Sequence, residues 1–447
     1  MFVLAWPIVL ARSAQAAIGF ADAAMIASFG KDALAATTTG ALNTFALFIL
    51  PMGLVFIVQS FAAQLLGKGD LVGARRYAWY GLLIAALTQV FAVAAYPFIG
   101  DLLALTDFTP EVRALMTTYI SIRLFGAGAT VATEALGAWF GGLGDTRMSL
   151  LANVVAMVVN IFLNWVLIYG HLGLPALGVE GAAIASTISV WVGFVAIAVV
   201  FARGWMPPGV ARVPVRARLR LGEFVRMLRF GLPSGLNWFL EFSAFLVFIN
   251  VVFAGLGTLA VAAIMSVSQV NSISFMPAFG LTSAGAILVG QAIGANDRDA
   301  VPAIVRRTGI VCATWQGVVA LFYVAIPATI MATFAEGDVA VSELVRLGTT
   351  LLAISAAWQL FDALVMTLSE ALRAAGDTAW PLWARIIVAW VVWLPLSVYV
   401  VRYNDGGPVA ATLSLLLYMV VLAGVILYRF RSGAWRHIDL TGQGPSH

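Results

Sequence analysis

Four acidic residues lie inside long apolar stretches of this 447-residue sequence: Asp22, Glu134, Glu241 and Asp362. A carboxylate at membrane depth costs roughly 2.5–3.5 kcal/mol on insertion scales, so a chain seldom carries one without a use for it. Glu241 is deep by any choice of boundaries, because no charged residue follows it before Asp297. The pattern predicts a transporter that moves a cation together with a second solute.

The composition indicates a polytopic integral membrane protein. Hydrophobic residues make up 62% of the chain and charged residues only 10%, whereas a soluble protein of this length carries about 25% charged residues. The apolar residues come in blocks that reach the roughly 20 residues a transmembrane helix needs. The stretch beginning at Phe2 lacks a cationic n-region and a clear cleavage site, so we interpret it as a retained first span.

Breaks at glycine, proline and charge clusters predict twelve spans. Their approximate ranges are 2–28, 34–64, 77–100, 113–140, 149–170, 178–202, 227–254, 258–292, 306–330, 343–371, 381–401 and 408–429. Basic residues concentrate in the even-numbered connections, above all between Arg203 and Arg220. Positive charge marks the cytoplasmic side, so we expect both termini in the cytoplasm. We interpret the basic run as a topology signal and not as a nucleic-acid site.

The chain repeats itself weakly at about half its length. The matching pieces, in the same order in both halves, are Pro7 and Pro233, Pro51 and Pro277, AQLLGKGD at 63–70 and GQAIGAND at 290–297, and GDT at 144–146 and 376–378. Six spans in each half keep both halves in the same orientation, so the repeats are parallel. The predicted fold class is an all-α polytopic membrane protein with twelve transmembrane helices in two six-helix lobes related by a pseudo-two-fold axis.

This plan predicts the domain organisation and a mechanism. We expect an N-lobe at 1–202, a cytoplasmic basic linker at 203–226, a C-lobe at 227–430 and a cytoplasmic tail at 431–447. A cavity between two such lobes that opens alternately to either side favours transport over catalysis. The sequence has no GxxxxGK[ST] motif and no His/Cys cluster. We therefore predict no enzyme activity, no metal beyond a monovalent cation, and no cofactor other than Na⁺ or H⁺ as coupling ion.

The chain resembles the multidrug and toxic compound extrusion (MATE) family from about Leu4 to Phe430. The most specific segments are GFADAAMIASFG around Asp22, GLGDTR at 142–147, NIFLNWVLIYGHLGLPALGVEGAAIAST at 160–187, the segment around Glu241, and LFDALVMTLSEALRAAGDT at 360–378. The resemblance implies a twelve-helix antiporter of the bacterial inner membrane. Such a protein expels organic, mainly cationic, amphipathic compounds in exchange for Na⁺ or H⁺.

The resemblance also implies ion sites. Asp22 and Asn160 match a first-span aspartate and a nearby asparagine that commonly form a cation or proton site. Glu241 and Asp362 match a cation site in the second lobe. The family often has an Asn-x-x-x-Asp pair in the fifth span, whereas Asn164 occupies the second position here. Because the N-lobe then has one carboxylate fewer, we expect coupling to depend mainly on the C-lobe.

The residues themselves leave alternatives open. Asp22 is either a coupling carboxylate or an exposed aspartate at a helix end. Asn160 and Asn164 lie one helical turn apart and supply either site oxygens or interhelical hydrogen bonds. Glu241 is either a cation-site carboxylate or a structural carboxylate held by an arginine or by polar neighbours. Glu241 and Asp362 show no obvious cationic partner in the sequence, which suits one monovalent cation or a shared proton. The side chains proposed to complete an oxygen shell are Asn237, Asn250, Ser266 and Gln269.

The cargo cavity is predicted to be acidic and apolar. Glu134 is either a substrate-facing carboxylate or the structural ion-pair partner of Arg12. Four large side chains would offer an adaptable surface to flat cationic drugs: Trp238, Phe275, Met276 and Trp358. We expect a monomer whose partners are small organic cations and the lipid bilayer.

Two other transport functions stay open. A lipid-linked precursor flippase of the same superfamily would line its cavity with Arg and Lys. Only Arg12 and Arg123 are counted at membrane depth, against four acids, which disfavours a flippase. An exporter of a single native metabolite is the second alternative. A membrane-embedded transferase is disfavoured, because the short connections lack a cluster of catalytic residues.

Overall fold

The computed structural model describes residues 1–104, 106, 108–214, 218–334, 340–404 and 406–442. Parts of the predicted basic linker (215–217) and of the predicted tail (443–447) lie outside these residues. Regular secondary structure in the described part of the chain is helical throughout. This confirms the all-α fold class.

Eleven helices in the described residues are long and apolar enough to cross a membrane. The predicted fourth span, 113–140, is the exception, because it is broken into α6 (Pro110–Leu124) and α7 (Ala127–Gly142). These pieces have 15 and 16 residues, so neither spans a membrane alone. Gln89 supports the break, because its Nε2 donates to Leu124 O at 3.1 Å and its Oε1 accepts from Gly128 N at 2.9 Å. Together the two pieces account for the twelfth predicted span.

The chain divides into two compact units. The N-terminal unit comprises Pro7–Gly235, and the C-terminal unit comprises Met1–Trp6 together with Leu236–His447. The divisions fall inside two helices, each beside a proline of the predicted repeat. The lobe boundaries expected from the sequence stay a prediction.

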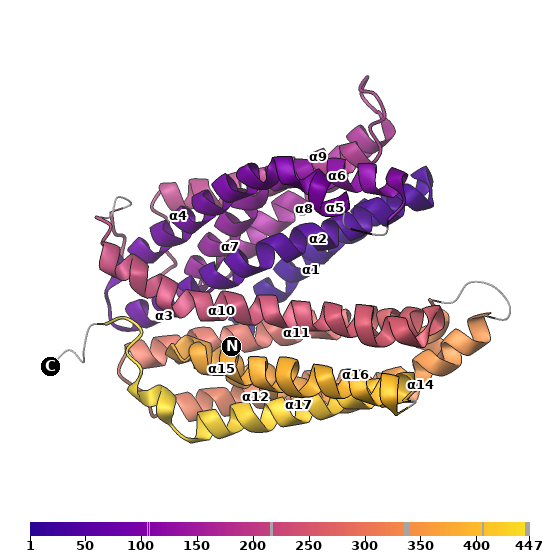
Figure 1. Ribbon diagram of the computed structural model, residues 1–447. Helices are drawn as coiled ribbons and strands as arrows, with labels where there is room; N and C mark the ends of the chain where they lie inside the picture. The colour runs from indigo at the N-terminus through magenta and orange to yellow at the C-terminus, as the bar shows by residue number, and fades with distance from the viewer. Residues whose placement is uncertain (105, 107, 215–217, 335–339, 405, 443–447) are drawn as a thin grey trace. The chain divides into compact units, whose positions relative to one another are not determined.

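The N-terminal unit is a bundle whose helices run lengthwise beside one another (Figure 1). Its helices are α1 (Phe2–Ile26), α2 (Lys31–Val55), α3 (Val58–Gly67), α4 (Leu71–Ala95), α5 (Ile99–Ala104), α6, α7, α8 (Arg147–Tyr169) and α9 (Val179–Ala202), with short 3-10 turns η1 (Ala27–Phe29) and η2 (Tyr96–Phe98). The most extensively packed helix pairs are α8 with α9, α4 with α7, and α2 with α6.

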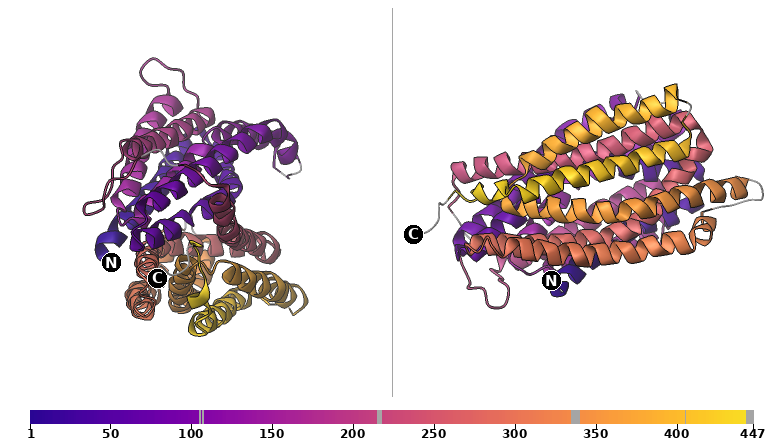
Figure 2. Two further views of the ribbon diagram at one scale, coloured as in Figure 1. Left: turned by 90° about the vertical axis from the view of Figure 1, so that its left-hand side faces the viewer. Right: turned by 90° about the horizontal axis from the view of Figure 1, so that it is seen from below.

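The C-terminal unit is a second helical bundle, seen from two further sides in Figure 2. Its elements are α10 (Leu221–Val247), η3 (Phe248–Phe253), η4 (Ala254–Leu256), α11 (Thr258–Gly294), α12 (Val301–Ala325), α13 (Pro327–Ala332), α14 (Ala340–Ala375), α15 (Ala379–Arg385), η5 (Ile386–Trp393), α16 (Leu394–Tyr403), α17 (Pro408–Arg431) and η6 (Ala434–His437). Helix α14 packs against α11, α12 and α17 and so lies at the centre of this unit.

The first part of α10 belongs to the N-terminal unit for identifiable reasons. Arg76 of α4 forms a two-point ion pair with Glu223, with Nε–Oε2 at 2.7 Å and Nη2–Oε1 at 2.9 Å. Gly231 lets α10 approach α2, since a Cβ there would lie 2.9 Å from Leu54 O. The Arg76–Glu223 ion pair and the close packing at Gly231 therefore hold the part of α10 before Gly235 against the N-terminal unit.

The paired motifs of the repeat form paired turns. The glycine of each GDT is left-handed, with φ 88° at Gly144 and 91° at Gly376. The amide of the following aspartate donates to a carbonyl five residues earlier, at 2.9 Å in the first half and 2.8 Å in the second. The other motif ends α3 and α11 in the same way, with Gly69 at φ 79° and Asn296 at φ 62°. Glycine and asparagine tolerate this conformation, so the repeated glycine and asparagine residues specify helix ends at matching places in the two halves.

Candidate cation-coupling sites

Asp22 of α1 is buried inside the N-terminal unit and is 6% exposed. Its Oδ1 accepts hydrogen bonds from Asn164 Nδ2 at 2.6 Å and Asn160 Nδ2 at 3.1 Å. Its Oδ2 accepts a third from Ser186 Oγ at 2.7 Å. The alternative of an exposed aspartate at a helix end is therefore wrong.

Two adjacent helices hold the neutral donors. Asn160 and Asn164 lie on one face of α8, and Ser186 lies on α9. Gly181 lets α9 approach α8, because a Cβ there would lie 2.6 Å from Leu167 O. The interhelical hydrogen bonds expected as one alternative are present, since Asn160 Nδ2 also donates to Ser186 Oγ at 3.1 Å. Ser186 was not among the residues predicted from the sequence, although it lies in the segment 160–187 that carries the family resemblance.

This cluster contains polar atoms without partners. Asn164 is fully buried, and its Oδ1 has no hydrogen-bond partner among the described residues. Arg123 of α6 lies within electrostatic range of Asp22. Its Nε and Nη1 are likewise buried and unbonded within the described part of the chain. An unmade hydrogen bond costs about 1–3 kcal/mol, so a ligand that used the free acceptor would be stabilised.

Glu134 lies elsewhere in the same unit, on α7, and is 8% exposed. Arg12 of α1 binds it at two points, Nη2–Oε1 at 2.7 Å and Nη1–Oε2 at 3.1 Å. This two-point geometry is the strong form of the arginine–carboxylate pair. The structural ion pair expected as an alternative is present. A substrate-facing role of Glu134 stays a prediction.

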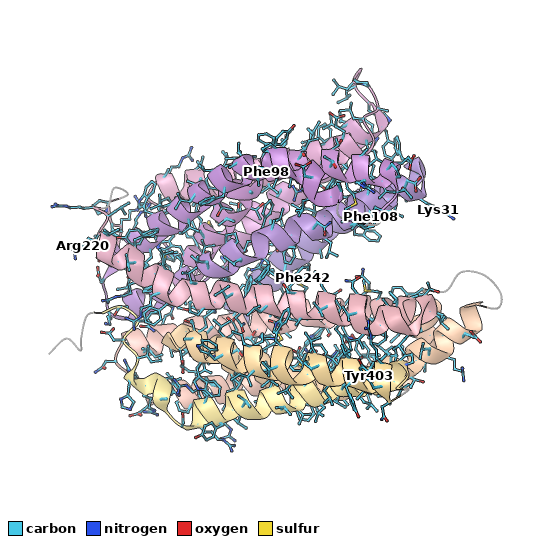
Figure 3. All side chains as sticks on the ribbon, viewed as in Figure 1. Lys31, Phe98, Phe108, Arg220, Phe242 and Tyr403 are labelled. Atoms are coloured by element: carbon cyan, nitrogen blue, oxygen red, sulfur yellow. The ribbon has the colours of Figure 1, made fainter. Side chains whose placement is uncertain are left out.

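Glu241 of α10 pairs with an arginine inside the C-terminal unit. Arg385, the last residue of α15, places Nη1 2.9 Å from Glu241 Oε1. The same guanidinium donates from Nε to Asn237 Oδ1 at 2.9 Å and from Nη1 to Tyr418 OH at 3.0 Å. The expectation that Glu241 has no cationic partner is therefore wrong. Phe242, labelled in Figure 3, marks the position of Glu241 along α10.

Asp362 of α14 lies within electrostatic range of Glu241 and Arg385 but forms no ion pair in the described structure. Its carboxylate accepts a long hydrogen bond from Gln316 Nε2 of α12 at 3.4 Å. Gln316 is fully buried, and its Oε1 has no partner among the described residues. Asp362 thus resembles Asp22 in having a neutral amide beside it and an unused amide oxygen close by.

The other predicted shell and wall residues are dispersed. Asn250 and Ser266 donate to carbonyls of their own helices. Trp238 meets Phe279 edge-on at 6.2 Å, and Phe279 stacks with Phe275 at 6.1 Å. Trp358 is 9% exposed and belongs to the core of the unit. The structure therefore joins Trp238 to Phe275 through Phe279.

One family model, MatE, matches the chain in two stretches, residues 7–166 and 233–399. The chain belongs to the MatE family. The two stretches begin at Pro7 and Pro233, the first matched pair of the internal repeat, which confirms that the halves correspond.

Named relatives cover most of the chain. A probable multidrug resistance protein NorM of Bradyrhizobium diazoefficiens is 31% identical over 444 residues, covering 97% of this chain and 93% of the relative. A probable NorM of Thermotoga maritima is 27% identical over 375 residues, covering 83% and 79%.

Solved structures show the same fold. A superfamily transporter from Pyrococcus furiosus, described as having a binding pocket of reverse polarity that suggests a different function, has a TM-score of 0.88 at 22% identity and covers 98% of this chain and 96% of its own. An outward-facing multidrug resistance MATE transporter has a TM-score of 0.85 at the same identity and coverage. At this identity the likeness shows the fold alone.

Arg385 changes the charge balance of this MatE protein. The count of only two arginines at membrane depth is wrong, because Arg385 pairs with Glu241, which lies deep in the predicted span 227–254. It could have been found in the sequence as the one basic residue between Trp383 and Leu396. Three arginines then face four acids, and two of those acids, Glu134 and Glu241, are already paired.

Proposed function

We propose that this protein is a secondary active multidrug efflux transporter. It exchanges Na⁺ or H⁺ for organic, mainly cationic, amphipathic compounds by alternating access. The observation that carries the proposal is that each unit contains an acid without an ion-pair partner in the described structure, Asp22 and Asp362. The names of the relatives support the cargo class.

The proposed setting is the bacterial inner membrane, with both termini in the cytoplasm and the protein acting as a monomer. The proposed N-lobe and C-lobe (1–202 and 227–430) are joined by the linker 203–226 and move relative to each other. The excess of basic residues in the even-numbered connections supports this orientation.

In the N-terminal unit we assign Asp22 as a coupling carboxylate, with Asn160, Asn164 and Ser186 positioning it. A rotation of the Asn164 amide by 180° replaces its N–H donors with Oδ1, which is otherwise unused. The cluster would then offer Na⁺ a carboxylate and an amide oxygen, the ligands that hard cations prefer. A proton on Asp22 would neutralise the same charge, and the carboxyl O–H could then donate to Asn164 Oδ1.

In the C-terminal unit we assign Asp362 as the second coupling carboxylate and Glu241 as its partner in a cation site. Gln316 Oε1 is the amide oxygen available there. The carboxylates, amides, guanidinium and tyrosine hydroxyl of this cluster come from five helices: α10, α12, α14, α15 and α17. A small shift of any one helix changes the cluster, which is what coupling to a conformational cycle requires.

Coupling needs the ion and the drug to weaken each other's binding, and this effect is reciprocal. One positive charge that enters down a membrane potential releases about 2.3 kcal/mol per 100 mV. One or two charges per cycle would support a drug concentration ratio of roughly tens to thousands, at about 1.4 kcal/mol per factor of ten.

The test is counterflow of ethidium, a monovalent organic cation, from liposomes that contain the purified protein. A Na⁺ gradient alone and an H⁺ gradient alone are applied to wild type, Asp22→Asn and Asp362→Asn. Asp32→Asn is the matched control, because Asp32 is an exposed aspartate in the first turn of α2. We expect one gradient to drive wild type and the control, and both site variants to lose the driven component.

Two results would contradict the proposal. If neither gradient moves ethidium in wild type, multidrug antiport is wrong, and transport of a lipid-linked precursor becomes the next assay. If both site variants keep full gradient-driven transport, the function stands but the assignment of its coupling residues is wrong.

A further inference from the structure

The C-terminal cluster contains a cation of its own. Arg385 is 5% exposed, so its guanidinium is buried. The side chain of Glu241, which it contacts at 2.9 Å, is 52% exposed. One partner of this ion pair is therefore enclosed, while the other is accessible.

The enclosed partner is held in place without Glu241. Asn237 Oδ1 accepts from its Nε, and Tyr418 OH accepts from its Nη1. Tyr418 is itself fixed, because its ring stacks on Trp393 at 4.8 Å. Arg385 also directly precedes the π-helical segment η5, which begins at Ile386. If Glu241 moves away, the guanidinium keeps two hydrogen bonds and its position.

The charges of the cluster fit one additional monovalent cation. Two carboxylates, Glu241 and Asp362, face a single guanidinium, so the formal charge is −2 + 1 = −1. One further positive charge neutralises the cluster, whereas a divalent cation leaves it with an excess of positive charge. Uncompensated charge away from bulk water is strongly disfavoured.

We propose that Arg385 is a tethered cation that competes with the transported organic cation for Glu241. When the cargo binds, its positive nitrogen takes the accessible carboxylate from Arg385. When the cargo leaves, the Glu241–Arg385 pair forms again. The inference rests on the proposed function, because it takes this cluster to lie on the path of a cationic cargo.

The competition has a clear physical consequence. A free carboxylate would bind an organic cation tightly and release it slowly. A tethered guanidinium lowers that affinity, because binding must first break an existing pair, and re-formation of the pair accompanies release. Arg385 would therefore favour turnover over retention of the cargo.

The test measures equilibrium binding of ethidium to the purified full-length protein by fluorescence anisotropy, without any ion gradient. We expect Arg385→Gln to bind about tenfold more tightly than wild type, which corresponds to about 1.4 kcal/mol, and to release ethidium more slowly. Arg385→Met repeats the test with a second neutral side chain. Arg385→Lys keeps the charge and is expected to stay near wild type.

Arg429→Gln is the matched control, because Arg429 forms an ion pair with Asp377 at 2.6 Å in the same unit, away from this cluster. We expect it to leave ethidium binding unchanged. The double variant Glu241→Gln/Arg385→Gln is expected to lose the gain in affinity, since the carboxylate competed for is absent.

A purely structural role of Arg385 predicts the opposite sign. In that case both neutral variants bind ethidium more weakly and unfold at lower temperature, and the proposal is overturned. It is also overturned if the neutral variants bind no more tightly than wild type. If wild type itself binds no organic cation, it is the proposed function that fails.

Discussion

In the N-terminal unit, Asp22 is 6% exposed and is held by neutral amide and hydroxyl donors from α8 and α9. In the C-terminal unit, Glu241 has a side chain that is 52% exposed and is held by the guanidinium of Arg385. Both are acids in membrane-spanning helices. The neutral donors leave the charge of Asp22 to be balanced by an incoming ion, whereas Arg385 already balances that of Glu241.

The comparison separates two tasks that a transporter must perform. A buried carboxylate without a built-in cation responds to a small ion, because only a small ion reaches it and removes its charge. An accessible carboxylate with a tethered cation responds to a larger cation that displaces the tether. We therefore shift the proposed centre of ion coupling toward Asp22, against the expectation that the C-lobe dominates.

The largest expected effect is on stability and concerns the buried Arg12–Glu134 ion pair, whereas Glu241 in the Glu241–Arg385 pair is half exposed. Arg12→Gln leaves Glu134, 8% exposed, without its cation. Breaking a buried pair from one side costs about 3–5 kcal/mol, so we expect a marked fall in unfolding temperature in detergent. The double variant Arg12→Gln/Glu134→Gln should recover most of it. Equal stability of Arg12→Gln and wild type would show that enclosure does not distinguish the two pairs.

The next effect concerns transport. Asp22→Asn removes a carboxylate that forms no ion pair in the described structure, so we expect gradient-driven ethidium transport to fall about 100-fold, or about 2.7 kcal/mol. Glu241→Gln should reduce it less than tenfold, because Asp362 still supplies a carboxylate within electrostatic range of Arg385. Initial rates in liposomes under the driving gradient provide the measurement. A larger loss for Glu241→Gln would reverse the comparison.

Asn164→Asp gives the N-terminal cluster a second carboxylate. Two adjacent carboxylates repel each other unless a cation or proton lies between them. We expect this variant to bind Na⁺ about tenfold more tightly than wild type, and its unfolding temperature to rise more steeply with Na⁺ concentration. KCl at equal ionic strength is the control. An unchanged Na⁺ dependence would argue that Asn164 does not face the ion.

The smallest effect tests the residue that the sequence did not reveal. Ser186→Ala removes one of the hydrogen bonds to Asp22, at 2.7 Å. A hydrogen bond to a charged group stabilises it by about 1.5–3 kcal/mol. The amides of Asn160 and Asn164 remain bonded to Asp22 and offset part of that loss. We expect the ion concentration that gives half-maximal transport to rise about fivefold.

Ser189→Ala is the control, because Ser189 lies one turn away and bonds to the carbonyl of Ser186. Equal effects of both variants would indicate a packing role.

Much of the architecture could be predicted from the sequence. Apolar blocks of spanning length specify helices locally, and repeated GDT and Gly/Asn turns specify where they end. The predicted span 113–140 is broken near Gly126, where Gln89 and Trp191 of other helices bond to the freed carbonyls. Partners from other helices cannot be seen in the segment itself.

The sequence by itself determined which charged residues lie in apolar stretches, because both the stretches and the charges inside them can be counted along the chain. Only the tertiary structure decided which of them are neutralised. Ser186 reaches Asp22, and Arg385 reaches Glu241, from helices far away in the sequence. The ion pairs and hydrogen bonds join atoms about 3 Å apart. They therefore depend on how the helices pack side by side, which cannot be read directly from the order of residues.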